Sequence, residues 1–529
     1  MEISMESPIG SLNDMELPGL DINNNPSVHS TASIEKEIET AEEYLQLGNA
    51  QPGTNTLTGL PMPHKTQPTT LTDVGNAQRL VNLYGPDLRY CYERKKWLSW
   101  NSRYWEWDAG DKIIERAKDT IRSIYREAAD EQDTANRTAL VNHAKSSERE
   151  QRIKAMIKLA ESIQDIPVKM QELDTDPWLF NCNNGTINLK TGFLQPHNKE
   201  DLITILVPID YSPDAQSPVW DAFLMQVMKN DPEMVKYLQR LVGYSMTGDN
   251  SCQIVPFLYG LGRNGKTTAL NCIRDMLGEY GTRVSTDVFM QLDKNFGGHK
   301  EGLANLRGKR FVVGSEINAE RRLNAALIKD ITGGETIKAD RKYEHEVEYK
   351  PTYKVWFFGN HKPEIRDSTL GMWRRVKLIE FNFTVPEKEV DPYLELKLKA
   401  ELPGILVWGV RGCTAWRLEG LAEPKKVTDA TMNYRQEQDI LADFIEDCCI
   451  LEPSARVSKA DLRWAYEKFC SNESSKPFSD KVFKSRLVDR GITDGHSGSI
   501  RWWNGIKLKS PALTGIWGQA GQQIHQSPT

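Results

Sequence analysis

The sequence predicts an α/β fold whose core is a sheet of parallel strands. Three apolar runs, IVPFLY at 254–259, RFVVG at 310–314 and KVWFFG at 354–359, have the length and composition of buried strands. The stretch TTALNCIRDML after the first run has helical spacing, and another helical pattern separates the second run from the third. Strands that alternate with helices are typical of parallel sheets covered by helices. We therefore expect a three-layer α/β core at residues 246–385.

The region before this core, residues 71–245, predicts a mixed α+β domain. TDVGNAQRLVNLY reads as a helix capped by Asp73, and KKWLSWNSRYWEWD reads as an aromatic hairpin that turns near Asn101. Its tryptophans either stack on bases or form a small core, which is the commoner use of such a cluster. Residues 112–165 are mostly helical, NCNNGTINLKTG predicts a pair of strands, and two helices follow over 218–246.

The region after the core divides into two parts. Residues 386–438 are predicted to be helical, and residues 439–510 give three helical patterns followed by a strand pair around Ile500–Trp503. Helices capped by Ser458 and Ser479 and followed by a hairpin are typical of a winged helix. The end segments, 1–70 and 511–529, are polar and read as tails that bury too little apolar surface to fold alone.

Composition excludes several classes of protein. The 529 residues carry a formal net charge of −6, yet residues 455–510 hold twelve Lys/Arg against six Asp/Glu, which predicts a local surface that faces a polyanion. Eight cysteines without a C-x-x-C pair argue against a zinc ribbon or disulfide framework and for a reducing cytoplasm. The acidic first residues predict that a signal peptide is absent, and no apolar stretch approaches the roughly 20 residues of a membrane helix.

The stretch FLYGLGRNGKTTAL, residues 257–270, contains a complete phosphate-binding loop, Gly260-x-x-x-x-Gly265-Lys266-Thr267. Glycines let successive N–H groups point at an anion, and the following helix adds its positive end. Lys266 is expected to reach the β- and γ-phosphates of ATP, and the Thr267 hydroxyl to bind Mg²⁺. A glycine-rich turn without a ligand is the alternative, but the flanking strand and helix favour nucleotide binding. The expected nucleotide-binding residues are Gly260, Gly262, Arg263, Asn264, Gly265, Lys266, Thr267 and Thr268.

Polar side chains also follow the second and third predicted strands. RFVVGSE ends in Glu316, and KVWFFGN ends in Asn360. An ATP hydrolase needs an acid that holds Mg²⁺ or orients water, and a polar side chain that contacts the γ-phosphate from an adjacent strand. Each of these residues alone is weak evidence for an ATP site. Together with Lys266 of the phosphate loop they make three such residues, each after an apolar strand, and the three are strong evidence. We therefore expect Lys266, Glu316 and Asn360 to form one site for ATP and Mg²⁺.

The ordered set GLGRNGKT, FVVGSE, GGETIKADRKY, KVWFFGN and GMWRR resembles the superfamily 3 helicases of viruses, phages and plasmids, most closely the phage and poxvirus primase-helicase family. The resemblance covers about residues 71–510 and implies an AAA+ domain that forms a ring around DNA. It implies that Lys266 and Thr267 bind phosphate and Mg²⁺. It also implies that Glu316 is the catalytic acid and Asn360 the sensor. Many relatives carry two adjacent acids where this chain has Ser315 and Glu316, so Glu316 serves both roles or Ser315 binds the metal through a water.

Two adjacent arginines, Arg374 and Arg375, lie in GMWRRVKLIEF shortly after Asn360. A guanidinium from a neighbouring subunit would neutralise charge at the γ-phosphate. Pairing with surface acids is the alternative. The family pattern favours an arginine finger, and either arginine can fill that role.

DNA contacts are expected in two places. Alternation from Tyr343 to Tyr349 predicts a hairpin arm, and Lys342 and Tyr343 fall where related papillomavirus helicases carry a Lys-His pair on a pore hairpin. A lysine there would hold a phosphate, and an aromatic ring would pack on a sugar or base. A surface hairpin in which Lys342 pairs with Glu344 or Glu346 is the alternative. The C-terminal winged helix either docks a protein or faces a duplex with basic residues, namely Lys481, Lys484, Arg486, Arg490 and Arg501.

Together, these expectations predict a ring-forming, ATP-dependent DNA helicase. It would serve the replication of a phage or mobile element in a bacterial cytoplasm. Its expected partners are single-stranded and forked DNA and further copies of the chain in a hexamer. About 70 weakly structured residues precede the shared region, with no zinc motif or Asp-x-Asp pair, so we expect primer synthesis to come from a separate primase. One alternative is an origin-binding initiator, which would prefer one duplex sequence. Another is a P-loop ATPase that acts on a protein or small molecule, which single-stranded DNA would not stimulate.

Overall fold

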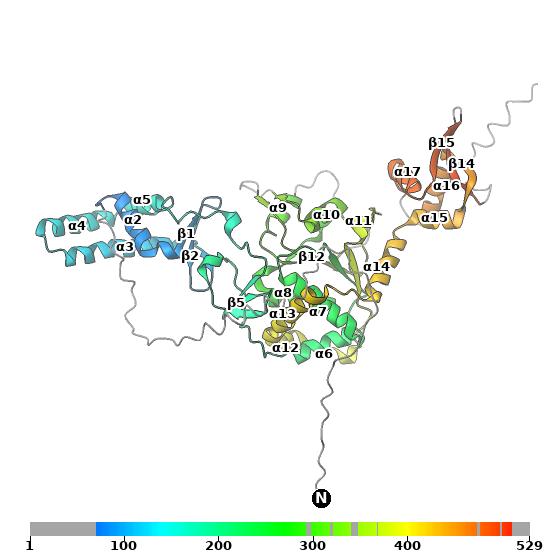
Figure 1. Cartoon of the computed structure of the whole chain (residues 1–529). Helices are drawn as coiled ribbons and strands as arrows, with labels where there is room; N and C mark the ends of the chain where they lie inside the picture. The colour runs from blue at the N-terminus through cyan, green and yellow to red at the C-terminus, as the bar shows by residue number, and fades with distance from the viewer. Residues whose placement is uncertain are drawn as a thin grey trace, which may run out of the picture.

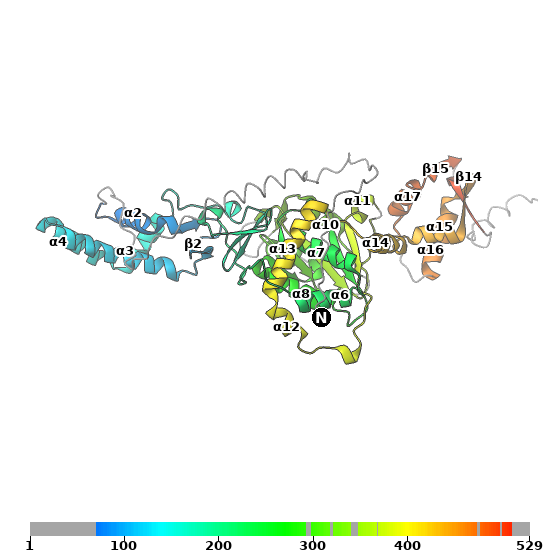
Figure 2. The ribbon, with the colours of Figure 1, turned by 60° about the horizontal axis from the view of Figure 1, so that its bottom comes forward.

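The computed structural model describes residues 70–291, 298–317, 321–339, 347–367, 369–472, 477–497 and 500–509. The elements form three parts in a row, which Figures 1 and 2 show from two directions. Helices α2–α5 lie at one end, a sheet with its helices forms the centre, and a small C-terminal part lies at the other end. Helix α14 (Lys425–Glu437) leads from the centre to the C-terminal part.

The first part combines four helices with a three-stranded antiparallel sheet. Helix α2 is capped by Thr72, whose side chain accepts a hydrogen bond from the Gly75 amide, and not by Asp73 as predicted. Trp105 is fully buried and donates from its indole to the Lys199 carbonyl at 2.8 Å, so the aromatic hairpin contributes to a core. The elements are α2 (Asp73–Tyr84), β1 (Leu88–Cys91), β2 (Lys96–Trp100), β3 (Trp105–Trp107), α3 (Asp111–Asp130), α4 (Thr134–Ser147) and α5 (Glu150–Ala160).

Five parallel strands form the central sheet, in the spatial order β13-β7-β12-β9-β8. The three predicted runs form its middle strands, so the prediction of a parallel α/β core is confirmed. Strand β8 is missing from the prediction because its segment GTRV is short, partly exposed and without an apolar run. The strands are β7 (Val255–Tyr259), β8 (Gly281–Val284), β9 (Phe311–Gly314), β12 (Lys354–Gly359) and β13 (Val376–Glu380).

Alternate side chains of these strands face two apolar cores. Leu258 and Phe358 pack on one face with helices α7 (Pro232–Met246), α8 (Lys266–Leu277) and α13 (Leu402–Glu419). Phe257 and Phe357 pack on the other face with α10 (Ala325–Gly333), α11 (Leu370–Trp373) and α14. Because neighbouring residues of a strand point to opposite faces, this alternation produces three layers. The other elements of the centre are β4 (Leu179–Cys182), β5 (Gly185–Asn188), β6 (Phe193–Gln195), α6 (Pro218–Val227), α9 (Gly298–Ala304) and α12 (Leu394–Ala400).

Two buried cations join the sheet to the end of helix α7. The Lys354 ammonium donates to the Thr247 carbonyl at 2.6 Å, and the Arg310 guanidinium donates to the Met246 carbonyl at 2.8 Å. These carbonyls lie at the C-terminal end of α7, where the helix dipole favours positive charge. Burial lowers the pKa of Lys354 to about 7.

The C-terminal part packs three helices on an antiparallel sheet of order β14-β16-β15. The helices and the hairpin agree with the prediction, and Ser458 accepts a hydrogen bond from the Asp461 amide at the start of α16. The side chain of Ser479, the other predicted cap, makes no capping hydrogen bond at the start of α17. Strand β14 is missing from the prediction because its segment contains a proline and shifts register between Leu451 and Arg456. The elements are α15 (Ile440–Cys448), β14 (Cys449–Ser458), α16 (Lys459–Asn472), α17 (Asp480–Val488), β15 (Thr493–Ser497) and β16 (Ile500–Leu508).

Strands β10 (Ile337–Ala339) and β11 (Val347–Tyr349) pair antiparallel, as arms of the predicted hairpin would. Lys342 and Tyr343, the predicted DNA contacts, lie outside the described residues. Across the ranges that the structure describes, none of the helices is both long and apolar enough to cross a membrane.

Candidate phosphate-binding site

The phosphate loop lies where neighbouring strands of the sheet end. Gly260 follows β7, Asn360 follows β12, and Ser315 follows β9. Because these three strands are parallel and adjacent, the residues that follow them meet at one edge of the sheet. Motifs that lie far apart in the sequence are thereby brought together.

The backbone of the loop requires glycine at two positions. Gly260 has a φ of 156°, and a Cβ there would lie 2.4 Å from both the Asn264 side chain and the Phe381 carbonyl. Gly265 has a φ of 83°, and a Cβ there would lie 2.7 Å from Val227 of helix α6. The loop therefore packs closely against its surroundings. Helix α8 begins directly after it, at Lys266.

The Lys266 side chain turns inward, with 4% of the residue's surface exposed. Its ammonium donates to the Gly260 carbonyl, to Asn264 Oδ1 at 2.9 Å and to Asn360 Oδ1 at 3.4 Å. Burial lowers the pKa of Lys266, and the negative charge of Glu316 partly opposes this shift. The structure thus brings the loop lysine, the predicted sensor and the predicted acid to one place.

Oxygen ligands suitable for Mg²⁺ lie at the same edge. Thr267, in the first turn of α8, and Glu316, after β9, are both exposed, and Thr268 is half-buried. A protein Mg²⁺ site usually supplies one or two carboxylates, while waters and phosphates complete the shell. One hydroxyl and one carboxylate fit that requirement. Within the described ranges, no three His, Cys, Asp or Glu side chains cluster so that they could hold a metal on their own.

Ser315, which replaces the first acid of many relatives, is bound to the neighbouring strand end. Its hydroxyl oxygen accepts from the Thr286 amide at 3.0 Å and lies 3.0 Å from the Thr286 hydroxyl. The Thr286 hydroxyl also donates to the Ser315 carbonyl. Ser315 therefore ties β9 to the segment after β8, and Glu316 is the carboxylate at this strand end. Thr286 belongs to no motif, so the sequence offered no signal for this contact.

A cavity of about 1160 Å³ lies beside the loop. Phe223 of α6 lines one side, the segment 385–395 lines another, and Gly265 and Thr268 border it. Its lining is partly apolar and partly acidic, and it has room for a nucleoside next to the loop. Sequence reasoning missed this cavity because its other walls, α6 and the segment 385–395, lie far from the loop along the chain and carry no motif.

Arg374 and Arg375 lie near the amino-terminal ends of the sheet strands, opposite the ends that carry the phosphate loop. The Arg375 carbonyl accepts from the Val255 amide at 2.7 Å, at the start of β7, whereas the phosphate loop follows the end of that strand. Arg375 is buried and donates to the Thr332 hydroxyl at 2.8 Å. Arg374 is exposed and donates to the Gln253 side-chain oxygen at 2.7 Å. The structure does not bring either arginine to the phosphate loop of its own chain.

The structure corrects the prediction that Arg486 faces a duplex. Arg486 is only 3% exposed, and its guanidinium donates to the Arg366 carbonyl at 2.6 Å and to Asp439 at 3.4 Å. Arg490 also donates to Asp439. Arg486 lies on α17 and Arg490 follows the end of that helix, and the sequence could not reveal that the central part covers the Arg486 side chain.

The other basic residues predicted to face DNA have different surroundings. Lys481 is exposed, and so is Arg501 on β16. Lys484 is exposed and forms an ion pair with Asp494 at 2.8 Å. These three side chains remain accessible on the C-terminal part.

Two regions of the chain match known protein families. Residues 77–229 match the family described as D5 N terminal like, and residues 258–375 match a family of unknown function, DUF5906. The second match covers the phosphate loop, Glu316, Asn360 and both arginines.

Similar curated proteins come from large DNA viruses. "Putative helicase L207/L206" of Acanthamoeba polyphaga mimivirus is 26% identical over 55% of this chain and 32% of its own length. "Putative helicase 022R" of Frog virus 3 is 26% identical over 45% and 26%, and "Putative primase C962R" of African swine fever virus (isolate Tick/Malawi/Lil 20-1/1983) is 23% identical over 57% and 34%. The chain therefore spans about a quarter to a third of the length of these relatives.

A solved structure, the apo C terminal region of NrS-1, aligns with 79% of this chain and 95% of its own at 11% identity. Its TM-score of 0.41 is too low to define a shared fold. The predicted resemblance to primase-helicases is nevertheless confirmed by the family match and the viral relatives.

Proposed function

We propose that this chain, a relative of the D5-like primase-helicases of large DNA viruses, is a ring-forming, ATP-dependent DNA helicase of the superfamily 3 type. We further propose that it serves the replication of a phage or other mobile element. The observation that carries the proposal is the hydrogen bond between Lys266 and Asn360. It joins a phosphate-binding lysine to the strand end from which a γ-phosphate can be sensed.

The proposed nucleotide is ATP, with its phosphates on the loop at the start of α8. Backbone N–H groups at a helix N-terminus attract phosphate, and the Lys266 ammonium adds a full positive charge. The base and sugar would occupy the cavity between α6 and the segment 385–395. Thr267 and Glu316 would hold Mg²⁺, which supplies positive charge at the phosphates when bound.

Hydrolysis needs an oriented water and stabilisation of the charge that develops on the γ-phosphate. Glu316 is exposed at the strand end, where its carboxylate can accept a proton from an attacking water. Asn360 can donate from its amide to the water or to the phosphate. The Lys266 ammonium follows the phosphate charge through the transition state.

A ring explains why the arginine pair lies far from the phosphate loop of its own chain. Arg374 is exposed and precedes β13, an outermost strand of the sheet. Its side chain could therefore reach the nucleotide of a neighbouring subunit. Arg375 is buried and bonded to Thr332, which suits a supporting role. We therefore propose Arg374 as the finger in an AAA+ hexamer.

DNA contact is proposed at the hairpin that carries Lys342 and Tyr343. The C-terminal part has the element order of a winged helix, and Lys481, Lys484 and Arg501 are its accessible basic residues. A separate primase is the proposed source of primers.

Strand displacement on forked DNA tests the proposal directly. The full chain should separate the strands when ATP and Mg²⁺ are present, and a sizing measurement under the same conditions should show a ring-sized assembly. An origin-binding initiator would instead bind one duplex sequence far more tightly than random DNA. Failure to separate forked DNA by an assembly that hydrolyses ATP would contradict the helicase proposal.

A further inference from the structure

Residues 360–367, which we call the sensor segment, leave the end of strand β12 and run toward helix α11. At its start, Asn360 accepts a hydrogen bond from Lys266 of the phosphate loop. The rest of the segment lies against α14 and the C-terminal part. One short stretch of the chain therefore contacts both the phosphate loop and a distant part of the fold.

Helix α14 holds the first half of the sensor segment. Lys362 donates to both carboxylate oxygens of Glu437, at 2.9 and 2.7 Å, and its ammonium lies 4.9 Å from the centre of the Tyr259 ring. The Tyr434 hydroxyl donates to the Pro363 carbonyl. Tyr434 is fully buried, so this contact is fixed within the core of the central part.

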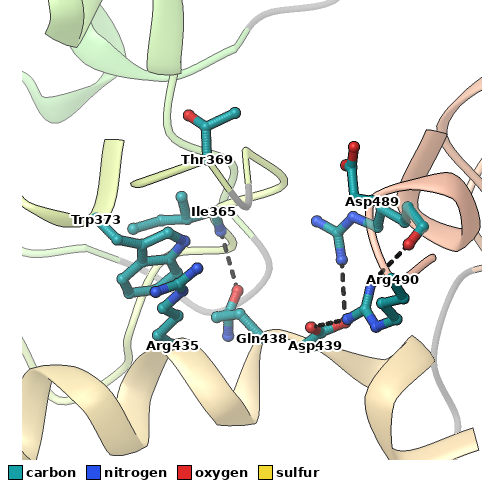
Figure 3. A pocket seen from close by; sticks show the side chains of 9 residues that line it. Ile365, Thr369, Trp373, Arg435, Gln438, Asp439, Asp489 and Arg490 are labelled. Carbon is teal, nitrogen blue, oxygen red and sulfur yellow. Dashed lines mark hydrogen bonds and ion pairs between the residues drawn. The ribbon is translucent and has the colours of Figure 1, made fainter. Parts of the chain in front are cut away.

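The second half of the segment meets the junction with the C-terminal part, which Figure 3 shows. The Ile365 amide donates to Gln438 Oε1 at 2.9 Å, one residue after α14 ends. The Arg366 carbonyl accepts from Arg486 of α17 at 2.6 Å. Both bonds use backbone groups of the sensor segment, so a shift of the segment must move or break them.

Asp439 is the centre of the junction on the C-terminal side. Its carboxylate accepts from both Arg486 and Arg490, and it also caps α15 by accepting from the Ala442 amide. A continuous series of hydrogen bonds thus runs from the sensor segment through Arg486 and Asp439 to the first helix of the C-terminal part. Arg486 is almost completely buried, so water screens its bond to the Arg366 carbonyl little.

A cavity of about 490 Å³ separates the sides of this junction. Trp373 lies on its wall and immediately precedes Arg374, the proposed finger. Tightly packed interfaces resist small displacements, whereas a cavity leaves room for two facing elements to approach or separate. The junction therefore has both a connection to the phosphate site and space in which to move.

We infer that the sensor segment couples the phosphate site to the placement of the C-terminal part, with Gln438 and Asp439 as the positioning residues. A nucleotide at Lys266 competes for the bond to Asn360 and displaces the start of the segment, and the backbone bonds at Ile365 and Arg366 carry that change to α17. Linkage is reciprocal, so a ligand that fixes the C-terminal part changes nucleotide affinity by the same factor. This inference rests on the proposed nucleotide site.

Amide hydrogen exchange of the full chain tests the coupling, with and without a non-hydrolysable ATP analogue and Mg²⁺. In the wild type, the analogue should slow exchange at 260–268 and also change it at 438–442 and 486–490. Gln438→Ala removes the bond to Ile365. Asp439→Asn keeps an acceptor for the α15 cap but removes the charge that holds both arginines. In both variants the change at 260–268 should persist, while the change at 486–490 should be lost.

Asp429→Asn is the matched control, because it breaks an exposed ion pair with Lys425 on the same helix, away from the junction. It should behave as the wild type does. Nucleotide affinity should rise about fivefold or more in the two junction variants, because the junction bonds no longer resist displacement of the segment, and stay unchanged in the control, since allosteric couplings are typically of that size or larger. If the analogue changed exchange at 486–490 in both junction variants as much as in the wild type, the inferred coupling would be overturned. An unchanged rate at 260–268 in the wild type would instead overturn the nucleotide site and with it this inference.

Discussion

The Lys266 ammonium lies 3.4 Å from the Asn360 side-chain oxygen, although 94 positions separate the two residues in the sequence. The parallel pairing of β7 and β12 produces this contact, because it places the residues after both strands at one edge. Phosphate binding at Lys266 would compete with this bond and free Asn360 for the γ-phosphate. In the proposed function, this contact would link phosphate binding to sensing through a single pair of side chains.

We predict that replacing Asn360 slows hydrolysis more than it weakens ATP binding. Asn360→Ala removes the amide that contacts the γ-phosphate, and loss of one such donor typically costs about 10²–10³ in rate. Asn360→Asp keeps an oxygen for Lys266 but lacks the amide donor, so it should be slow as well. Steady-state hydrolysis and equilibrium binding of an ATP analogue measure the two effects. Normal turnover in Asn360→Asp would show that only the bond to Lys266 matters.

Replacing Arg374 and replacing Arg375 should affect stability and hydrolysis differently. Arg375→Ala loses a buried bond to Thr332 and should reduce the free energy of unfolding by about 2 kcal/mol. Arg374→Ala should leave stability within about 0.5 kcal/mol, because its side chain is exposed, while hydrolysis falls about 10³-fold or more. Denaturant unfolding and ATPase assays separate these outcomes. Mixing Arg374→Ala with Lys266→Ala subunits should restore part of the activity, and no recovery in confirmed mixed rings would argue against a shared site.

Lys354 should make stability depend on pH between about 7 and 10.5. Burial lowers the folded-state pKa of Lys354 from 10.5 to about 7, so unfolding takes up a proton in this interval. Its contribution to stability is present above pH 10.5 and is lost as the pH falls to about 7, by at most about 1.4 kcal/mol per pH unit. Lys354→Met should abolish this slope, whereas Lys350→Met, at an exposed lysine nearby, should retain it. Thermal unfolding midpoints across the interval give the comparison, and equal slopes in both variants would refute the assignment.

The hairpin residues Lys342 and Tyr343 should be needed for DNA coupling and not for basal hydrolysis. The double replacement by alanine removes one phosphate contact and one stacking contact per subunit, and the stacking contact alone is worth about 1–3 kcal/mol. Stimulation by DNA, unwinding and the salt dependence of single-strand binding should all decrease. Lys350→Ala, at the exposed end of the same arm, is the control for loss of charge. Unwinding of forked DNA at the wild-type rate by the double variant would exclude the hairpin as the DNA grip.

The sequence predicted which side chains come together at the strand ends, because its signals are local. Lys266, Glu316 and Asn360 each follow an apolar run, and parallel strands bring such positions to one edge by geometry alone. The same reasoning predicted the three layers, since alternating apolar runs and helical patterns leave few other arrangements.

Contacts between distant parts of the chain could not be predicted in this way. Arg486 has the spacing of an exposed basic residue on α17, yet Arg366 and Asp439 bury it at a junction that no motif marks. Ser315 stands in a motif position, but Thr286 fixes its hydroxyl from a segment without any signature. Strand β14 was missed because a proline and a register shift interrupt its pattern. Tertiary packing overrides the local signal at Arg486, whereas Thr286 and β14 gave no clear local signal at all.

ATP hydrolysis by the full chain, measured with and without single-stranded DNA, tests the central claim most directly. The wild type should hydrolyse ATP and do so faster when single-stranded DNA is present. Lys266→Ala should lose about 100-fold or more in rate under both conditions, because the charge that follows the γ-phosphate is gone. Lys236→Ala, at an exposed lysine of α7, should match the wild type. Wild-type turnover in a folded Lys266→Ala variant, or a wild-type rate indifferent to DNA, would contradict the account.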